Sequence, residues 1–227
     1  MTLAQQLAAE FLGTAALLAA IVGSGIMGAV LAGGNAGLAL LANAAATAGA
    51  LYVLIAVLGP ISGAHFNPAV TLALRVRGEL GNAETLAYIA VQLVAAIAGV
   101  LLAHAMFGQP LLQPGIHARS GAAQWLSEGV ATAGLLLTIL LGARARPAAM
   151  PALVASYIFA AYWFTASTSF ANPAVTVARA LTRTFAGIRP DDIPGFVLAQ
   201  LAGTAAALLV TRLLQDQAND TKSPSSA

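Results

Sequence analysis

The amino-acid sequence predicts an all-α membrane protein with six transmembrane helices and two shorter half-helices, arranged as two inverted repeats. Three observations lead to this prediction. Of the 227 residues, 59% are hydrophobic and only 8% are charged, whereas an average soluble domain is about 25% charged. Long apolar stretches recur along the chain, separated by short polar turns. One sequence, Asn-Pro-Ala-Val-Thr, occurs twice, beginning at Asn67 and at Asn172.

Six apolar stretches approach or reach the length of about 20 residues that a helix needs to cross a bilayer. Turns rich in glycine, proline or arginine separate them. The predicted spans are Leu7–Leu31, Leu38–Leu58, Ala83–Phe107, Trp125–Leu141, Met150–Thr165 and Ile193–Leu214.

Each copy of the repeated sequence is predicted to begin a short helix. Asn caps the first turn with its side-chain oxygen, and Pro suits the first helical position because its backbone angle is preset. The helix-compatible residues that follow are too few to span a bilayer, so half-helices are predicted at 67–77 and 172–183. The residues of the two motifs are Asn67, Pro68 and Ala69, and Asn172, Pro173 and Ala174.

The two halves of the chain repeat one another. Glu10 opens the first span as Glu128 opens the fourth, and Gln92 in the third corresponds to Gln200 in the sixth. Because each half has an odd number of spans, the second half enters from the opposite face, and the half-helices meet near the midplane. The predicted units are a first repeat at 1–107, a connecting loop at 108–123, a second repeat at 124–215 and a disordered polar tail at 216–227.

Basic residues in the loops indicate the orientation. With the N-terminus inside, six of the ten Lys and Arg residues face the cytoplasm and four lie outside, in the direction of the usual bias. The prediction is a multi-pass protein of the cell's inner (plasma) membrane, with both termini cytoplasmic. The net charge of +2 is spread over loops and does not indicate a nucleic-acid partner.

Six spans with two half-helices that begin at Asn-Pro-Ala resemble the major intrinsic protein family, the aquaporins and glycerol facilitators. The resemblance covers Leu7 to Leu214 and includes Glu10, the segment Ser62-Gly63-Ala64-His65, both Asn-Pro-Ala motifs and the two glutamines. It implies a passive channel for small neutral solutes, with neither enzymatic activity nor a cofactor. It also implies a homotetramer in membrane lipid, in which every subunit has its own pore.

In such a pore, Asn67 and Asn172 are expected to donate N–H groups to a passing solute, while the two half-helix dipoles repel cations. In the family, carboxylates matching Glu10 and Glu128 brace the half-helix loops; a proton relay is the alternative for such buried acids. His65 is expected to line the cytoplasmic half of the pore, with pH sensing as its alternative.

The outer filter departs from the family pattern, because Val175 stands where most members carry an Arg. An ungapped count against that pattern places the other filter positions at Thr47, Ala160 and Ser169. Without an aromatic residue or an arginine, this filter is predicted to be wide and uncharged. The combination resembles aquaporin-like channels encoded with bacterial arsenic-resistance genes, which pass arsenous acid and methylated arsenicals.

Arg179 follows Val175 by four residues and so lies on the same helix face. Long helical side chains lean toward the N-terminus, which would bring its guanidinium toward the level of the missing arginine. The alternative is that Arg179 faces away from the lumen, pairs with Asp191 or Asp192, or lies at the membrane surface with Arg183.

Other polar and small residues have simpler interpretations. His104 and His117 show no partner pattern, and three scattered histidines without cysteine make neither a metal site nor a catalytic set. Gly99 and Gly203 are expected at close helix contacts. The aromatic residues Trp125, Tyr157, Tyr162 and Trp163 are expected as interface anchors, packing residues or solute contacts.

An ion-coupled secondary transporter is the alternative function, because such transporters also use inverted repeats and half-helices. It would need paired acidic residues in the spans, and apart from Glu10 and Glu128 the sequence offers none.

Overall fold

The computed structural model describes the backbone of residues 1–220 and the side chains of residues 1–214. Within this part of the chain six helices are long and apolar enough to cross a membrane, and no β-strand occurs. The elements are α1 (Leu3–Leu31), α2 (Ala36–Ser62), α3 (Pro68–Val76), α4 (Asn82–Met106), α5 (Ala122–Ala145), η1 (Pro147–Ala149), α6 (Met150–Phe164), α7 (Pro173–Arg179), η2 (Pro190–Asp192) and α8 (Ile193–Asp220). The predicted fold class is confirmed.

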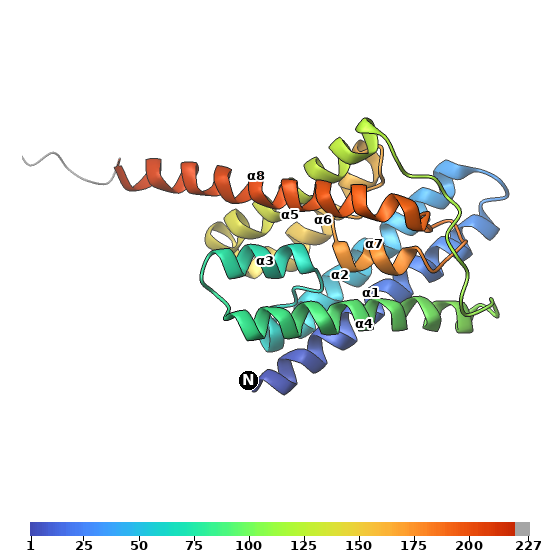
Figure 1. The fold of residues 1–227 in the computed structure, drawn as a ribbon, viewed down its shortest axis with the longest axis horizontal. Helices are drawn as coiled ribbons and strands as arrows, with labels where there is room; N and C mark the ends of the chain where they lie inside the picture. Colours follow the sequence, from blue (N-terminus) through green and yellow to red (C-terminus); the bar gives the residue numbers. More distant parts are fainter. Residues whose placement is uncertain (221–227) are drawn as a thin grey trace, which may run out of the picture.

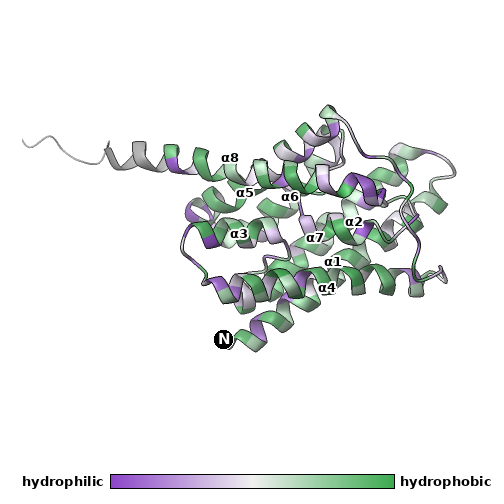
Figure 2. Ribbon diagram, in the orientation of Figure 1, coloured by the Kyte–Doolittle hydropathy of each residue, from purple (hydrophilic) through white to green (hydrophobic). Residues whose placement is uncertain are grey.

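Hydrophobic residues cover most of each long helix, and hydrophilic residues gather near helix ends and in the loops (Figure 2). This is the distribution that a bilayer requires, because helix interiors meet lipid or other helices while the ends reach water. The two short helices, α3 and α7, have 9 and 7 residues. They lie end to end between α4 and α8 (Figure 1).

The halves of the molecule make matching contacts. In the first half α1 packs against α2 and α4, and in the second half α5 packs against α6 and α8. The halves join through α2 and α6 and through the short helices, because α3 also contacts α8 and α7 also contacts α4. Each half-helix is therefore held by both halves of the chain.

Several helix ends differ from the sequence prediction, among them those of α2, α7 and α8. The second span was expected to end at Leu58, but α2 continues to Ser62 and ends where Gly63 adopts a left-handed φ of 86°, which glycine does at no steric cost. The second half-helix ends at Arg179, four residues earlier than predicted. α8 continues to Asp220, beyond the predicted end of the sixth span at Leu214, and 221–227 lie outside the described residues.

Two glycines allow the long helices to approach closely. A Cβ atom at Gly99 of α4 would overlap the carbonyl oxygen of Ala15 in α1, and one at Gly203 of α8 would overlap the carbonyl oxygen of Gly129 in α5. The close contacts expected for both glycines are confirmed. They occur at equivalent helix pairs of the two halves.

Candidate functional site

The loops before α3 and α7 have the same unusual backbone. Ala64 and Phe66 in the first loop have φ angles of 50° and 48°, and Ser169 and Ala171, at the same distances before the second Asn, have φ angles of 52° and 48°. This left-handed conformation costs roughly 1–2 kcal/mol for each residue with a Cβ atom. Both loops must therefore be held in place by contacts with their surroundings.

The Glu10 carboxylate holds the first loop. It is fully buried, and its Oε1 accepts hydrogen bonds from Ser62 Oγ at 2.7 Å and from the His65 N–H at 2.9 Å. Its Oε2 accepts from the Phe66 N–H at 2.7 Å and from Gln92 Nε2 at 2.8 Å. Four donors from α2, α4 and the loop thus converge on one carboxylate of α1.

Glu128 makes the equivalent contacts in the second half. Its Oε1 accepts from the Phe170 N–H at 2.8 Å, and its Oε2 accepts from the Ala171 N–H at 2.9 Å and from Gln200 Nε2 at 2.7 Å. Both glutamates face loop amides, as a bracing role requires. These hydrogen bonds employ the carboxylate oxygens that a proton relay would need.

The two Asn-Pro-Ala motifs are joined directly to each other. Asn67 Nδ2 donates to the Ala171 carbonyl at 2.7 Å, and Asn172 Nδ2 donates to the Phe66 carbonyl at 2.8 Å. The Oδ1 atoms of both residues cap their helices, at 2.9 Å from the N–H of Ala69 in α3 and of Ala174 in α7. An Asn amide has two donor hydrogens, so one on each residue remains after these bonds.

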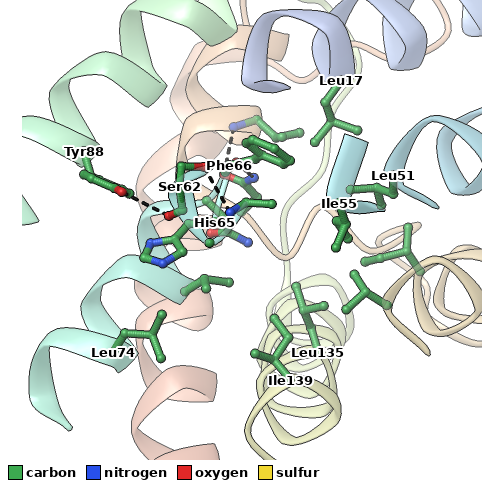
Figure 3. A pocket seen from close by; sticks show the side chains of 18 of the residues that line it. Leu17, Leu51, Ile55, Ser62, His65, Phe66, Leu74, Tyr88, Leu135 and Ile139 are labelled. Carbon is green, nitrogen blue, oxygen red and sulfur yellow. Dashed lines mark hydrogen bonds between the residues drawn. The ribbon is translucent and has the colours of Figure 1, made fainter. Parts of the chain in front are cut away.

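A cavity of about 450 Å³ passes both asparagines. Its lining reaches Gln6 and Glu84, near the starts of α1 and α4, and extends past the motifs to Arg179. Leu51 and Ile55 lie across the cavity from His65 (Figure 3). The cavity is thus a path with one apolar wall and one wall of loop backbone and amides, which suits a small polar solute that also carries C–H surface.

The hydrogen-bond pattern assigns the tautomer of His65, which lines this cavity. The Thr71 hydroxyl donates to the Asn67 carbonyl at 3.1 Å and accepts from Gln92 Nε2 at 3.1 Å. Its remaining lone pair faces His65 Nδ1 at 3.1 Å, so Nδ1 carries the hydrogen and Nε2 is an acceptor. His65 therefore has a lone pair on Nε2 that can accept a hydrogen bond from a solute hydroxyl in the cavity.

One predicted filter position is wrong. Thr47, Ser169 and Val175 line the cavity, but Ala160 is exposed and does not. Tyr162 of α6 lines it instead, with its hydroxyl 3.3 Å from Thr47 Oγ1. Two helix residues turn the side chain by about 200°, so an ungapped count that misplaces the register on α6 selects the wrong face.

Tyr162 also corrects the expectation of a filter without an aromatic residue. The sequence analysis left this tyrosine among several aromatic residues with packing, interface or solute roles. Its position four residues after Ile158, which lines the cavity as well, is the helical spacing that would have identified the inner face of α6. The cavity is thus lined by one aromatic side chain, Tyr162, in addition to the three small predicted filter residues.

Arg179 is buried at 2% exposure and lines the same cavity. Its Nε donates to the Ala186 carbonyl, and its guanidinium carbon lies 3.4 Å from the centroid of the Phe170 ring. Neither Asp191 nor Asp192 pairs with it; Asp192 bonds Arg189 instead, at 3.1 Å. Of the two alternatives for Arg179, the structure places the side chain at the cavity.

A second arginine near the site was counted in the sequence analysis only among the basic residues that indicate the orientation. Arg119, between α4 and α5, donates to the carbonyls of Gly187 and Ser167 at 2.9 and 3.2 Å, and its guanidinium carbon lies 5.0 Å from the centroid of the Phe170 ring. Burial lowers the pKa of the Arg119 guanidinium, and the charge of Glu128 opposes that effect. Arg119 thereby connects the loop between α4 and α5 to the backbone beside the Phe170 ring.

His104, for which the sequence showed no partner pattern, has hydrogen-bond partners in the structure. It is fully buried, with Nδ1 2.7 Å from the Leu111 carbonyl and Nε2 2.8 Å from Thr182 Oγ1. A carbonyl only accepts, so Nδ1 carries the hydrogen and Nε2 accepts from the threonine. His104 thereby ties α4 to the connecting loop and to the segment after α7. The geometry is that of a structural clamp.

Comparisons with known proteins agree with this architecture. The family model described as Major intrinsic protein matches residues 1–160. The chain is 55% identical over 212 residues to Aquaglyceroporin AqpS of Rhizobium meliloti (strain 1021), covering 93% of this chain and 91% of that protein. It is 34% identical over 140 residues to Aquaporin Z of Brucella melitensis, covering 61% and 60% of the two chains.

A solved structure has the same fold. The X-ray structure of the aquaglyceroporin from Plasmodium falciparum superposes with a TM-score of 0.70, covering 93% of this chain and 95% of that one at 18% sequence identity. At that identity the likeness concerns the fold alone. With the family model and the 55% identical relative, it shows that the chain belongs to the major intrinsic protein family and is a multi-pass membrane channel, not an enzyme.

Proposed function

We propose that the chain is a passive channel for water and glycerol-like polyols, and that it also admits neutral metalloid acids such as arsenous acid and methylated arsenicals. The observation that carries the proposal is the cavity that passes the amides of Asn67 and Asn172. The 55% identity to a protein named an aquaglyceroporin supports the polyol part. Arsenous acid is uncharged at neutral pH and carries three hydroxyl groups, so it offers a channel the same chemistry as a polyol.

At the centre of the pore, a solute oxygen accepts a hydrogen bond from the remaining amide hydrogen of Asn67 or Asn172. Its own hydroxyl hydrogen finds acceptors in the loop backbone and at His65 Nε2. The N-termini of α3 and α7 meet at this point, and their partial positive charges repel cations. A neutral solute thus exchanges water for wall contacts, whereas an ion loses hydration without compensation.

The filter is proposed to be wide enough for solutes larger than water. Thr47, Ser169 and Val175 are small, and none of them reaches as far across the lumen as an arginine at position 175 would. Tyr162 limits the opening on one side only. A methylated arsenical has both a methyl group and hydroxyl groups, which the apolar wall and the amide donors can accommodate together.

The assembly and orientation are proposals of the same kind. We propose a homotetramer in the inner (plasma) membrane, with lipid around it and both termini cytoplasmic. The repeats are proposed to comprise 1–107 and 124–215, with a connecting loop at 108–123.

The proposed function is tested with purified protein in liposomes, by measuring water, glycerol, urea and arsenous acid permeability side by side. We expect glycerol and arsenous acid fluxes well above those of empty liposomes. The fluxes should be linear in solute concentration and unaffected by a pH gradient. Saturating, proton-coupled flux would instead favour an ion-coupled transporter and would overturn the channel proposal.

Replacing Val175 with Arg tests the width of the filter. Val175 is buried and lines the cavity, so a long side chain there projects into the path. We expect glycerol and arsenous acid permeability to fall at least tenfold, with a smaller fall for water. The matched control is Val175→Leu, which adds only one methylene group and no charge, and should change both fluxes less. Equal glycerol-to-water ratios in Val175→Arg and the unmodified protein would remove Val175 from the filter.

A further inference from the structure

Arg179 brings a positive charge to the outer part of the cavity from the last position of α7. Its Nε is bonded to the Ala186 carbonyl and its plane rests on Phe170, whose ring also packs edge-to-face on Phe196 at 5.1 Å between centroids. The guanidinium is therefore held in one orientation. A held guanidinium presents its other donors in a fixed direction, which a flexible cation does not.

Two buried polar atoms at this end of the cavity have no hydrogen-bond partner among the side chains described, residues 1–214. They are Nη1 of Arg179 and Oγ of Ser169, and both residues line the cavity. An unpaired buried donor is costly, roughly 1–3 kcal/mol and more for a charged group, so such groups point to a missing partner.

Arg119, the neighbouring cation, already donates hydrogen bonds to the protein. Arg119 lies near the same phenylalanine ring, but its guanidinium donates to the carbonyls of Ser167 and Gly187. Within the described side chains no carboxylate lies at salt-bridge distance from Arg179. The charge of Arg179 is thus not neutralised by an ion pair, and its free donor is available to whatever occupies the cavity.

We infer that Arg179 takes the place of the arginine absent at position 175, and that its Nη1 and Ser169 Oγ together bind an oxygen atom of the permeating solute. The inference rests on the proposed channel function and names the site at which that channel selects hydroxyl-bearing solutes. Four helical residues correspond to about 6 Å along the axis. The Cα atom of Arg179 is therefore one turn farther along α7 than that of Val175, and its guanidinium excludes cations without filling the filter at Val175.

This arrangement separates two properties that a filter arginine combines. The width at Val175 decides which neutral solutes fit. The charge at Arg179 excludes cations, because a fixed positive charge in a poorly hydrated path repels them strongly. A site built to hydrogen-bond a solute oxygen also discriminates against analogues that lack it.

The test compares Arg179→Met and Arg179→Lys with the unmodified protein in liposomes, using glycerol, its deoxy analogue 1,2-propanediol, and methylammonium as a small cation. Arg183, exposed in the segment after α7, provides the matched control as Arg183→Met. We expect no methylammonium flux in the unmodified protein, in Arg179→Lys or in Arg183→Met. Arg179→Met should admit methylammonium at least tenfold above background and reduce the glycerol-to-propanediol ratio severalfold.

A relocation variant separates the effect of the lost charge from that of the lost packing, because it also lacks the Arg179 side chain but restores the guanidinium. Val175→Arg with Arg179→Met moves the guanidinium one turn inward and should exclude methylammonium while it suppresses glycerol. Methylammonium flux in the unmodified protein, or unchanged exclusion and solute ratio in Arg179→Met, would overturn the inference while the channel proposal stands. Absence of glycerol flux in the unmodified protein would overturn the channel proposal itself, and the inference with it.

Discussion

Replacing Glu10 with Gln is expected to destabilise the channel by roughly 1–3 kcal/mol, because a buried backbone donor is left without an acceptor. Oε1 of Glu10 faces the His65 N–H and Oε2 faces the Phe66 N–H. In either orientation of a glutamine, its NH₂ group meets one of these N–H groups, which can only donate. The loop then loses the contact that compensates for its left-handed residues.

The measurement is thermal unfolding in detergent, followed by glycerol flux of the protein that remains folded. A clear loss of thermal stability, together with reduced flux per folded channel, is the expected result. Asp191→Asn is the control, because Asp191 is an exposed carboxylate and its neutralisation should leave both quantities unchanged. A Glu10→Gln channel as stable as the unmodified one would show that the loop holds its conformation without the carboxylate.

Replacing Gly99 with Ala is expected to be at least as damaging, since the added methyl group overlaps the carbonyl oxygen of Ala15. That atom belongs to helix backbone and cannot move alone, so α1 and α4 must separate along their interface. Overpacking of this kind typically costs about 1–3 kcal/mol. The loss of the close contact between the α1 and α4 backbones adds to this cost. We expect a sharply reduced yield of folded protein, measured by size-exclusion chromatography in detergent.

Gly49→Ala is the matched control for this substitution. Gly49 also lies within a long helix, α2, but a Cβ atom there meets nothing within 4 Å. Alanine in place of glycine generally favours helix by up to about 1 kcal/mol, so the control should be neutral or slightly stabilising. Gly203→Ala, in the equivalent helix pair of the second half, should resemble Gly99→Ala. Normal folding of both variants would mean that the helices can shift to accept the methyl groups.

The main features of this channel are encoded locally and could be predicted without coordinates. Apolar length reveals the six spans because bilayer thickness fixes how many residues a helix needs. Asn67-Pro68 and Asn172-Pro173 predict helix starts because capping and proline geometry involve adjacent residues only. The paired positions of Glu10 and Glu128, read with the family resemblance, indicated the loops that these carboxylates contact.

Only the tertiary structure decided which side chains share the cavity. Tyr162 rather than Ala160 faces the lumen because helix phase depends on how the loop before Asn172 folds, and a count of residues does not contain that information. The direction of Arg179 was open because its determinants, the Ala186 carbonyl and the Phe170 ring, lie outside its own helix. His104 and Arg119 are likewise decided by partners 78 and 68 residues away in sequence. Local patterns specify the elements of this protein, whereas contacts between distant segments determine which side chains meet the solute.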